Sequence, residues 1–165
     1  MRQPADTGPF RILFVCTGNT CRSPMAEAIA RRRIDELGWT QVEVSSAGVG
    51  AFGGSPASGG ALRAAAANGL DLSEHEASLL THSLAEDADL ILTMSTAHLA
   101  RVSELGAGDH AALITSFAAA GDAGAPSGGV PDPIGGSDEE YAQTFRVLED
   151  LVGRALDRLE AVVSP

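Results

Sequence analysis

The sequence is poor in cationic side chains and contains no long apolar run. Its 165 residues include 11 basic and 22 acidic side chains, which gives a formal net charge of −11 and an isoelectric point near 4.6. This acidic balance argues against binding to nucleic acid or to an anionic membrane surface, because both partners attract basic patches. No apolar stretch reaches the roughly 18 residues that a membrane span requires.

Cysteines and localisation signals are also scarce. The segment from Met1 to Pro9 has no hydrophobic stretch long enough for a secretory signal, so we expect a cytoplasmic protein. The two cysteines, Cys16 and Cys21, lie too close in sequence to join distant parts of the chain. A reactive thiol with a neighbour is therefore a better interpretation than a structural disulfide. The four histidines lack the spacing of metal ligands, so we expect no metal and no cofactor.

The remaining pattern indicates a single α/β domain. Residues 1–9 are expected to form a disordered tail, and residues 10–165 one folded domain. Short apolar runs predict four strands, and segments with helical spacing predict five helices. The strands are expected at 11–15, 42–44, 89–94 and 111–115, and the helices at 24–37, 61–68, 83–88, 96–105 and from 137 onward. This alternation predicts a three-layer sandwich, with a four-stranded parallel sheet flanked by about five helices.

The segment from Cys16 to Glu27, with the sequence CTGNTCRSPMAE, carries the main functional signal. A predicted strand delivers Cys16 to a polar turn, and Ser23 followed by Pro24 predicts an N-cap and a first helical position. Successive backbone N–H groups in such a turn form a concave anion site, where the helix dipole adds positive charge. Both effects favour a thiolate at Cys16, and the planar fork of Arg22 can bind two phosphate oxygens. The segment therefore predicts a phosphoryl-transfer site.

This segment resembles the phosphate-binding loop of the low-molecular-weight protein-tyrosine phosphatases, and within that family it is similar to the bacterial protein-arginine phosphatases. Three further segments extend the resemblance over nearly the whole chain in the family's order: Ser46–Gly48, Ala88–Met94 and Asp132–Ser137. The resemblance implies a protein phosphatase that hydrolyses phosphotyrosine or phosphoarginine through a phosphocysteine intermediate. It also implies phosphorylated proteins as substrates, and inorganic phosphate or a similar oxyanion in the site.

The resemblance assigns three catalytic residues. Cys16 is expected to be the nucleophile, and Arg22 to bind the phosphate in the transition state. Asp132, between two prolines, is expected to be the general acid that protonates the leaving group and later activates water. Three nearby acids, which start a predicted helix, compete with it for this role but suit helix stabilisation better: Asp138, Glu139 and Glu140.

The resemblance also assigns phosphate-binding and supporting residues. Ser23 is expected to hold the thiolate, and Asn19 to maintain the strained turn. Ser46 and His75 match positions that orient this asparagine, although His75 also suits a surface position in an acidic stretch. The phosphate-binding loop comprises Thr17, Gly18, Asn19, Thr20, Cys21, Arg22 and Ser23.

Three residues are expected to line the substrate pocket, and two of them depart from the tyrosine-phosphatase pattern. Ile134 replaces the aromatic residue that usually follows Asp-Pro, whereas Phe52 matches the opposite wall. Thr20 replaces a common isoleucine, and its hydroxyl can hydrogen-bond a guanidinium group but gains nothing from an aryl ring. Thr20 therefore favours phosphoarginine, but Ile134 does not support this preference.

Cys21 has two interpretations. It could form a reversible disulfide with Cys16 that switches off the nucleophile, or it could only pack beneath the helix. Two alternative functions also remain. An arsenate reductase would need an external thiol, because the chain has no further cysteine to relay a disulfide. A catalytically silent phosphoprotein-binding module is the other alternative, although the three expected catalytic residues are all present.

Overall fold

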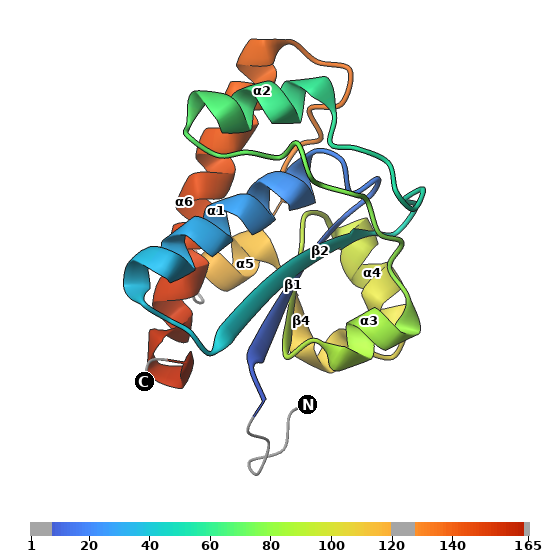
Figure 1. Ribbon diagram of the computed structural model, residues 1–165. Coiled ribbons are helices and arrows are strands. Elements are labelled where there is room, and N and C mark those ends of the chain that lie inside the picture. Colours follow the sequence, from blue (N-terminus) through green and yellow to red (C-terminus); the bar gives the residue numbers. More distant parts are fainter. Residues whose placement is uncertain (1–7, 120–127, 164–165) are drawn as a thin grey trace.

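The computed structural model describes residues 8–119 and 128–163, which form a parallel sheet between two layers of helices (Figure 1). The strands are β1 (Phe10–Cys16), β2 (Val42–Gly48), β3 (Leu90–Thr93) and β4 (Ala111–Leu113). The helices are α1 (Arg22–Leu37), α2 (Gly59–Ala67), α3 (His82–Asp87), α4 (Thr96–Glu104), α5 (Ile114–Ala119) and α6 (Asp138–Val163), and the 3₁₀ turn η1 spans Gly108–His110. The predicted sandwich is thus confirmed, with six α-helices in the described residues. Residues 1–7 of the expected tail lie outside these residues.

The sheet has the strand order β2-β1-β3-β4, and all its strand pairs are parallel. β1 is central and buried on both faces, because successive side chains of a strand point to opposite sides. Ile12 and Phe14 pack in the core that α1 and α6 cover, whereas Leu13 and Val15 pack in the core beneath α3 and α4. This double burial explains why β1 is a continuous apolar run rather than an alternating one.

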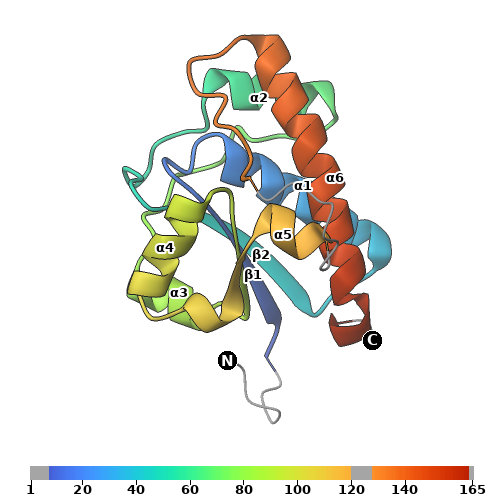
Figure 2. The same ribbon diagram turned by 180° about the vertical axis from the view of Figure 1, so that it is seen from behind.

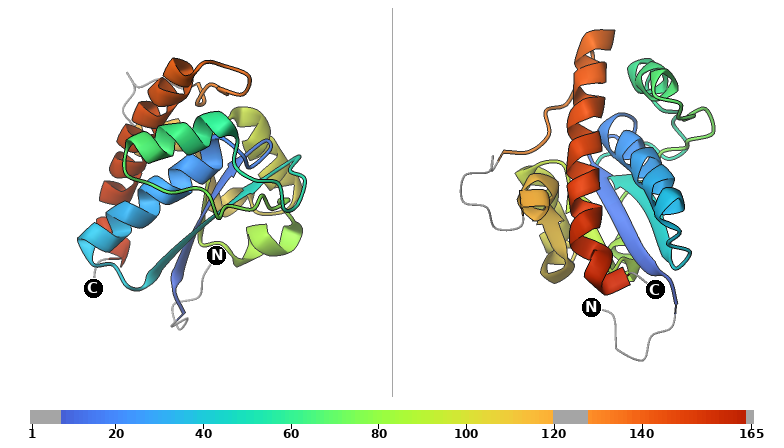
Figure 3. Two further views of the ribbon diagram at one scale, coloured as in Figure 1. Left: turned by 45° about the horizontal axis from the view of Figure 1, so that its top comes forward. Right: turned by 90° about the vertical axis from the view of Figure 1, so that its left-hand side faces the viewer.

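Helix α6 spans the length of the molecule and packs against α1, α2 and α5 (Figure 2). Figure 3 shows α2 at the end of the molecule where α6 begins. Gly60 of α2 lies directly on the ring of Tyr141, since a Cβ atom at this glycine would come within 2.3 Å of the ring. An ion pair of 2.9 Å between Arg63 and Asp138 joins the same two helices at the surface.

Helix α1 ends as predicted but begins differently. Gly38 ends it in the left-handed conformation, with φ of 73°, and donates its N–H back into the last turn. The prediction that Ser23 is the N-cap is wrong, because the helix begins at Arg22 and Cys21 takes the cap position without a side-chain capping bond. The hydroxyl of Ser23 is instead used in the preceding loop, where it lies 2.9 Å from Cys16 Sγ.

The end of the fourth strand was also predicted too far along the chain. β4 stops at Leu113, and α5 begins at Ile114 where the strand was expected to continue. Two of the first three residues of α5, Ile114 and Thr115, are β-branched and favour a strand locally. Packing against α6 overrides this preference, because it buries Ile114 and Ala118. Helix α5 ends at Ala119, and residues 120–127 lie outside the described residues.

Candidate active site

The site lies beyond the carboxyl ends of the strands, where ligands bind in open α/β sheets. β1 ends at Cys16, and the chain then turns through residues 17–21 into α1. β2 runs beside β1 and brings Gly48 opposite Cys16, while the N–H of Val49 donates to the carbonyl of Cys16 at 2.9 Å. A Cβ atom at Gly48 would lie only 2.4 Å from the carbonyl oxygen of Thr17, so the loop packs directly on this glycine backbone.

Asn19 holds the turn with bonds from both its backbone and its side chain. It is fully buried and has a φ of 56°, a positive value that asparagine tolerates better than most residues. Its amide donates to Ser23 Oγ at 2.8 Å and to Ser46 Oγ at 2.9 Å, and its side-chain oxygen accepts the N–H of Ser78 at 2.8 Å. His75 Nε2 lies 2.7 Å from the carbonyl oxygen of Asn19. The structure thus brings Ser46 and His75 together around Asn19.

A line of buried hydrogen bonds leads from helix α1 to the sulfur of Cys16. Glu27 Oε1 accepts the hydroxyl of Ser46 at 2.6 Å, and Ser46 in turn accepts from Asn19. Asn19 also donates to Ser23, whose hydroxyl hydrogen remains available for Cys16 Sγ, 2.9 Å away. Glu27 was not predicted as a site residue, although it belongs to the loop motif and lies one helical turn after Ser23.

Arg22 is 5% exposed and lies under the loop that carries Asp132. Its Nη1 donates to the carbonyl of Val130 at 2.8 Å, and its Nη2 lies 3.4 Å from Thr17 Oγ1 and 3.5 Å from Asp132 Oδ2. The other oxygen of Asp132 accepts the N–H of Ile134 at 3.1 Å, which fixes the direction of the carboxylate. Arg22 Nε is buried and has no hydrogen-bond partner among the described residues, which leaves it available to an oxyanion.

His98 is a second residue beside the loop that was not predicted from the sequence. It is 3% exposed on the first turn of α4, and its Nε2 lies 2.8 Å from Thr17 Oγ1. Burial lowers the pKa of His98 to about 4, and the positive charge of Arg22 acts in the same direction, against a smaller opposing effect of Asp132. The ring is therefore neutral at pH 7. No local motif marks this histidine, because it reaches the loop only through the pairing of β1 with β3.

The expected substrate-pocket residues differ in exposure. Phe52 is 82% exposed and Ile134 is 59% exposed, so both apolar side chains are open to solvent. Thr20 lies in the loop itself and is half-buried, with its Oγ1 3.7 Å from Cys21 Sγ. Their roles as pocket walls stay predictions.

Cys21 is buried between α1, α2 and α6. Its sulfur lies 3.2 Å from Ser58 Oγ and 3.3 Å from the hydroxyl of Tyr141. Burial raises the pKa of Tyr141, and the bond to Cys21 adds to this effect. Cys16 and Cys21 are both free thiols. The packing role suggested for Cys21 matches these contacts, and its redox role stays a prediction.

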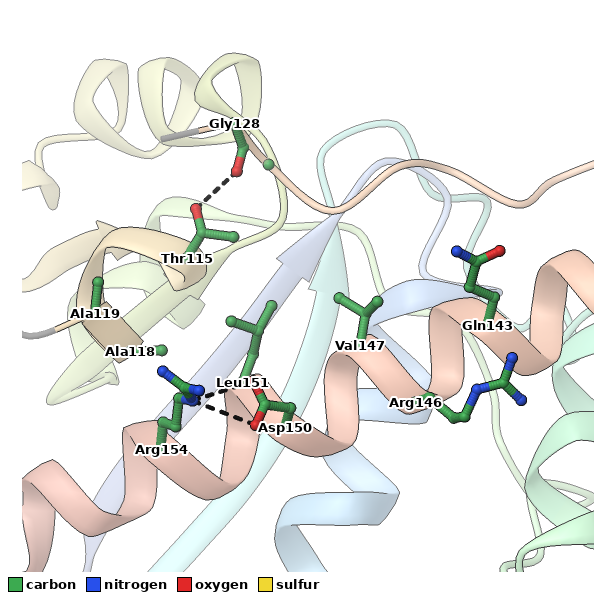
Figure 4. A pocket seen from close by; sticks show the side chains of 11 residues that line it. Thr115, Ala118, Ala119, Gly128, Gln143, Arg146, Val147, Asp150, Leu151 and Arg154 are labelled. Carbon is green, nitrogen blue, oxygen red and sulfur yellow. Dashed lines mark hydrogen bonds and ion pairs between the residues drawn. The ribbon is translucent and has the colours of Figure 1, made fainter. Parts of the chain in front are cut away.

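One hollow on the surface lies away from the predicted site residues and is larger than the hollow beside Asp132. Its volume is about 680 Å³, and Figure 4 shows it between α5 and α6, with the ion pair of Asp150 and Arg154 on its wall. A smaller hollow of about 190 Å³ includes Asp132 and Val130. Within residues 8–119 and 128–163 we find no cluster of three or more His, Cys, Asp or Glu side chains suited to a metal ion. The same residues include no helix with the length and apolarity needed to span a bilayer.

The fold and the loop together define a class: an α/β protein whose first strand ends at a cysteine, and whose next turn leads into a first helix that begins with an arginine. The sequence model of the family described as "Low molecular weight phosphotyrosine protein phosphatase" matches residues 11–164. The chain therefore belongs to this family.

Individual relatives agree with this assignment. A probable low-molecular-weight protein-tyrosine-phosphatase, EpsP from Ralstonia solanacearum, is 50% identical over 52% of this chain, and the match spans 56% of that relative's length. A protein-arginine-phosphatase from Geobacillus stearothermophilus is 36% identical over 92% of this chain and 97% of its own. The crystal structure of a low-molecular-weight protein tyrosine phosphatase from T. tengcongensis superposes with a TM-score of 0.83 at 38% identity, covering 91% of this chain and 99% of that chain.

Proposed function

We propose that this chain is a protein phosphatase that hydrolyses phosphotyrosine or phosphoarginine side chains through a phosphocysteine intermediate. One observation carries the proposal: the sulfur of Cys16 lies 2.9 Å from the hydroxyl of Ser23, in the same short loop whose Arg22 has an unpartnered, buried Nε within the described residues. A nucleophile, a donor to its negative charge and a cationic oxyanion ligand are thus held together. Membership of the family supports the same reading.

In the first step, the sulfur of Cys16 attacks the phosphorus atom and the bond from phosphorus to the leaving group breaks. Arg22 and the N–H groups at the start of α1 bind the non-bridging oxygens, whose negative charge must be stabilised in the transition state. Asp132 gives its proton to the departing oxygen or nitrogen. Its 3.5 Å separation from Arg22 Nη2 places this carboxylate beside the phosphate ligand.

In the second step, a water molecule attacks the phosphocysteine, and Asp132 accepts its proton. The bond between phosphorus and sulfur breaks, and the sulfur leaves with its electron pair as a thiolate. Ser23 stabilises this leaving group by donating its hydroxyl hydrogen. Inorganic phosphate is then released, and the loop returns to its starting state.

The substrate preference depends on Thr20, which lies in the loop between Asn19 and Cys21. A threonine hydroxyl accepts a hydrogen bond from the N–H groups of a phosphoarginine, whereas an apolar side chain suits a phenol ring. The Geobacillus protein-arginine-phosphatase, at 36% identity, and the T. tengcongensis protein tyrosine phosphatase, at 38% identity, match most of this chain about equally well, so the preference for phosphoarginine depends on Thr20 alone. The two free cysteines of the loop suit a reducing compartment, so we place the enzyme in the cytoplasm.

Replacing the nucleophile tests the proposed function. Cys16→Ser is expected to abolish hydrolysis of p-nitrophenyl phosphate while retaining binding of inorganic phosphate, measured by calorimetry. In the wild-type enzyme, acid quenching during turnover should trap a covalent phosphoryl group on Cys16, identified by peptide mass spectrometry.

Three outcomes would contradict the proposal. Turnover that persists in Cys16→Ser would remove the assigned nucleophile. Phosphate binding without any hydrolysis in the wild type would indicate a silent binding module. Arsenate reduction with glutathione, in the absence of phosphatase activity, would indicate the reductase alternative.

A further inference from the structure

Each terminal nitrogen of Arg22 is connected, through one intermediate residue, to the turn between β3 and α4. We use the name β3–α4 turn for Met94–His98, which comprises the two residues between β3 and α4 and the first turn of α4. On one side, Nη1 of Arg22 donates to the carbonyl of Val130 at 2.8 Å, and the N–H of Val130 donates to the carbonyl of Met94 at 2.8 Å. Gly129 lies so close to this turn that a Cβ atom would come within 2.1 Å of the same carbonyl oxygen.

On the other side, the connection runs through side chains. Nη2 of Arg22 lies 3.4 Å from Thr17 Oγ1, and that oxygen lies 2.8 Å from Nε2 of His98. Thr17 directly follows the nucleophile, so its hydroxyl stands between His98 and the guanidinium. The contact between threonine and histidine is the shorter of the two, and it therefore limits where the threonine oxygen can lie.

His98 itself is held firmly. Ser95 caps α4 by accepting the N–H of His98 at 3.3 Å, and the imidazole is 3% exposed. The N–H of Met94 donates to the carbonyl of Val15 at 3.0 Å, which sets the turn in register with the residue just before Cys16. Position and orientation of the ring are thus fixed relative to the loop.

The imidazole makes its hydrogen bond toward the site and nowhere else in the described part of the chain. Its Nδ1 is buried without a hydrogen-bond partner there, so the contact of Nε2 with Thr17 is the polar contact that orients the ring. Because burial and Arg22 lower the pKa of His98 to about 4, the ring is uncharged at neutral pH and does not repel the guanidinium. A neutral ring can hold the hydroxyl of Thr17 in place without competing with Arg22 for a bound anion.

We propose that His98 is a positioning residue that acts through Thr17 to fix the orientation of the Arg22 guanidinium for oxyanion binding. This inference rests on the proposed phosphatase function. It assigns to α4, which contributes no residue to the loop, an indirect part in aligning Arg22.

Selective alkylation of Cys16 separates this role from a general loss of structure. Iodoacetate carries a carboxylate that an aligned Arg22 attracts, whereas iodoacetamide is neutral and reports the reactivity of the sulfur alone. In His98→Leu, the rate with iodoacetate at Cys16 is expected to fall on the order of tenfold relative to iodoacetamide. The kcat/KM for p-nitrophenyl phosphate is expected to fall on the order of 100-fold, as misplacement of a catalytic group does.

Two further variants follow the connection atom by atom. Thr17→Val keeps the shape of the side chain but removes the bridging oxygen, so it should reproduce the effect of His98→Leu, and the double variant should add little more. His98→Gln places an amide nitrogen near the position of Nε2 and should restore much of the alkylation ratio. Circular dichroism and thermal unfolding confirm that each variant is folded.

A histidine elsewhere, whose side chain is 7% exposed, provides the control. His110, on η1, bonds through Nε2 to the carbonyl of Ala85 at 2.9 Å, and His110→Leu should leave the alkylation ratio unchanged. An unchanged ratio in folded His98→Leu would overturn the inference while leaving the phosphatase function intact. Absence of hydrolysis in the wild type would instead refute the proposed function, and the alkylation ratio would still test the alignment of Arg22.

Discussion

The hydroxyl of Ser23 lies 2.9 Å from the sulfur of Cys16, and both side chains are shut off from solvent. A serine at the start of a helix ordinarily caps it, but here the helix has no side-chain cap and the hydroxyl lies against the sulfur of the proposed nucleophile. The uncapped N–H groups of α1 then remain for an anion. The Ser23 hydroxyl thus contacts the sulfur of Cys16 instead of forming a helix-capping bond that would stabilise α1.

Replacing this hydroxyl should slow the second chemical step. In Ser23→Ala the departing thiolate loses its hydrogen-bond donor, so we expect breakdown of the phosphocysteine to become rate-limiting, with a loss on the order of 100-fold in kcat. Stopped-flow measurement with p-nitrophenyl phosphate should then show a burst of one nitrophenol per enzyme. A uniform slowing without a burst would mean that the hydroxyl acts only in the first step.

The strained turn at Asn19 can be separated into its two contributions. Asn19→Gly keeps the positive φ but loses the amide bonds, whereas Asn19→Ala loses both. We expect Asn19→Ala to lower the free energy of unfolding by about 2–4 kcal/mol, and Asn19→Gly by about 1 kcal/mol less. Urea unfolding followed by circular dichroism gives both values. Equal losses in the two variants would show that backbone strain contributes nothing.

Removal of the proposed acid should affect substrates unequally. Asp132→Asn is expected to reduce kcat/KM strongly for phosphate esters of phenol and only weakly for those of nitrophenol, because a good leaving group needs no proton. A plot of log kcat/KM against the leaving-group pKa measures this slope. An unchanged slope would assign the acid to another residue, and Glu140 provides a matched control as a nearby carboxylate bonded to Ser137.

Thr20 is expected to set the substrate preference. Thr20→Ile should lower kcat/KM for a phosphoarginine peptide and raise it for a phosphotyrosine peptide, which changes their ratio on the order of tenfold or more. Thr20→Ser, which keeps the hydroxyl, is the matched control and should preserve the phosphoarginine preference. If the ratio is the same in all three proteins, the hydroxyl does not select the substrate.

The depressed pKa of His98 should make stability depend on pH. The folded protein resists protonation of this ring down to about pH 4, whereas the unfolded chain takes up the proton near its ordinary pKa of about 6.5. The contribution of neutral His98 to the free energy of unfolding is therefore fully present above about pH 6.5. It is lost as the pH falls from about 6.5 toward 4, by on the order of 2–3 kcal/mol. Urea unfolding at several pH values should show a shallower decline in His98→Gln. If the free energy of unfolding falls equally with pH in the wild type and in His98→Gln, the lowered pKa of His98 is contradicted.

Local sequence signals were sufficient to find the four strands and to place the loop after the first of them, but not to fix every boundary. The apolar run of β1 and the glycine that ends α1 are local patterns, so they predict a strand and a helix end without knowledge of the tertiary structure. The family resemblance supplied Ser46 and His75, which the structure brings to Asn19.

The residues that were missed depend on contacts between distant segments. His98 meets Thr17 across 81 positions because β3 pairs with β1, and no spacing rule encodes this pairing. The helix α5 was missed because its β-branched residues favour a strand, while burial against α6 decides its conformation. The wrong N-cap at Ser23 has a similar cause: the sequence rule was sound, but a competing bond to Cys16 prevailed.

The amide of Asn19 is already saturated, since both of its hydrogens and its oxygen are engaged with protein groups. A loop held by these hydrogen bonds is preorganised, so it needs little conformational change when an anion binds. Capture of phosphate should therefore proceed at the pace of diffusion and expulsion of water, without a slow rearrangement. The free-energy cost of shaping the loop is therefore met once, during folding, and not again each time an anion binds.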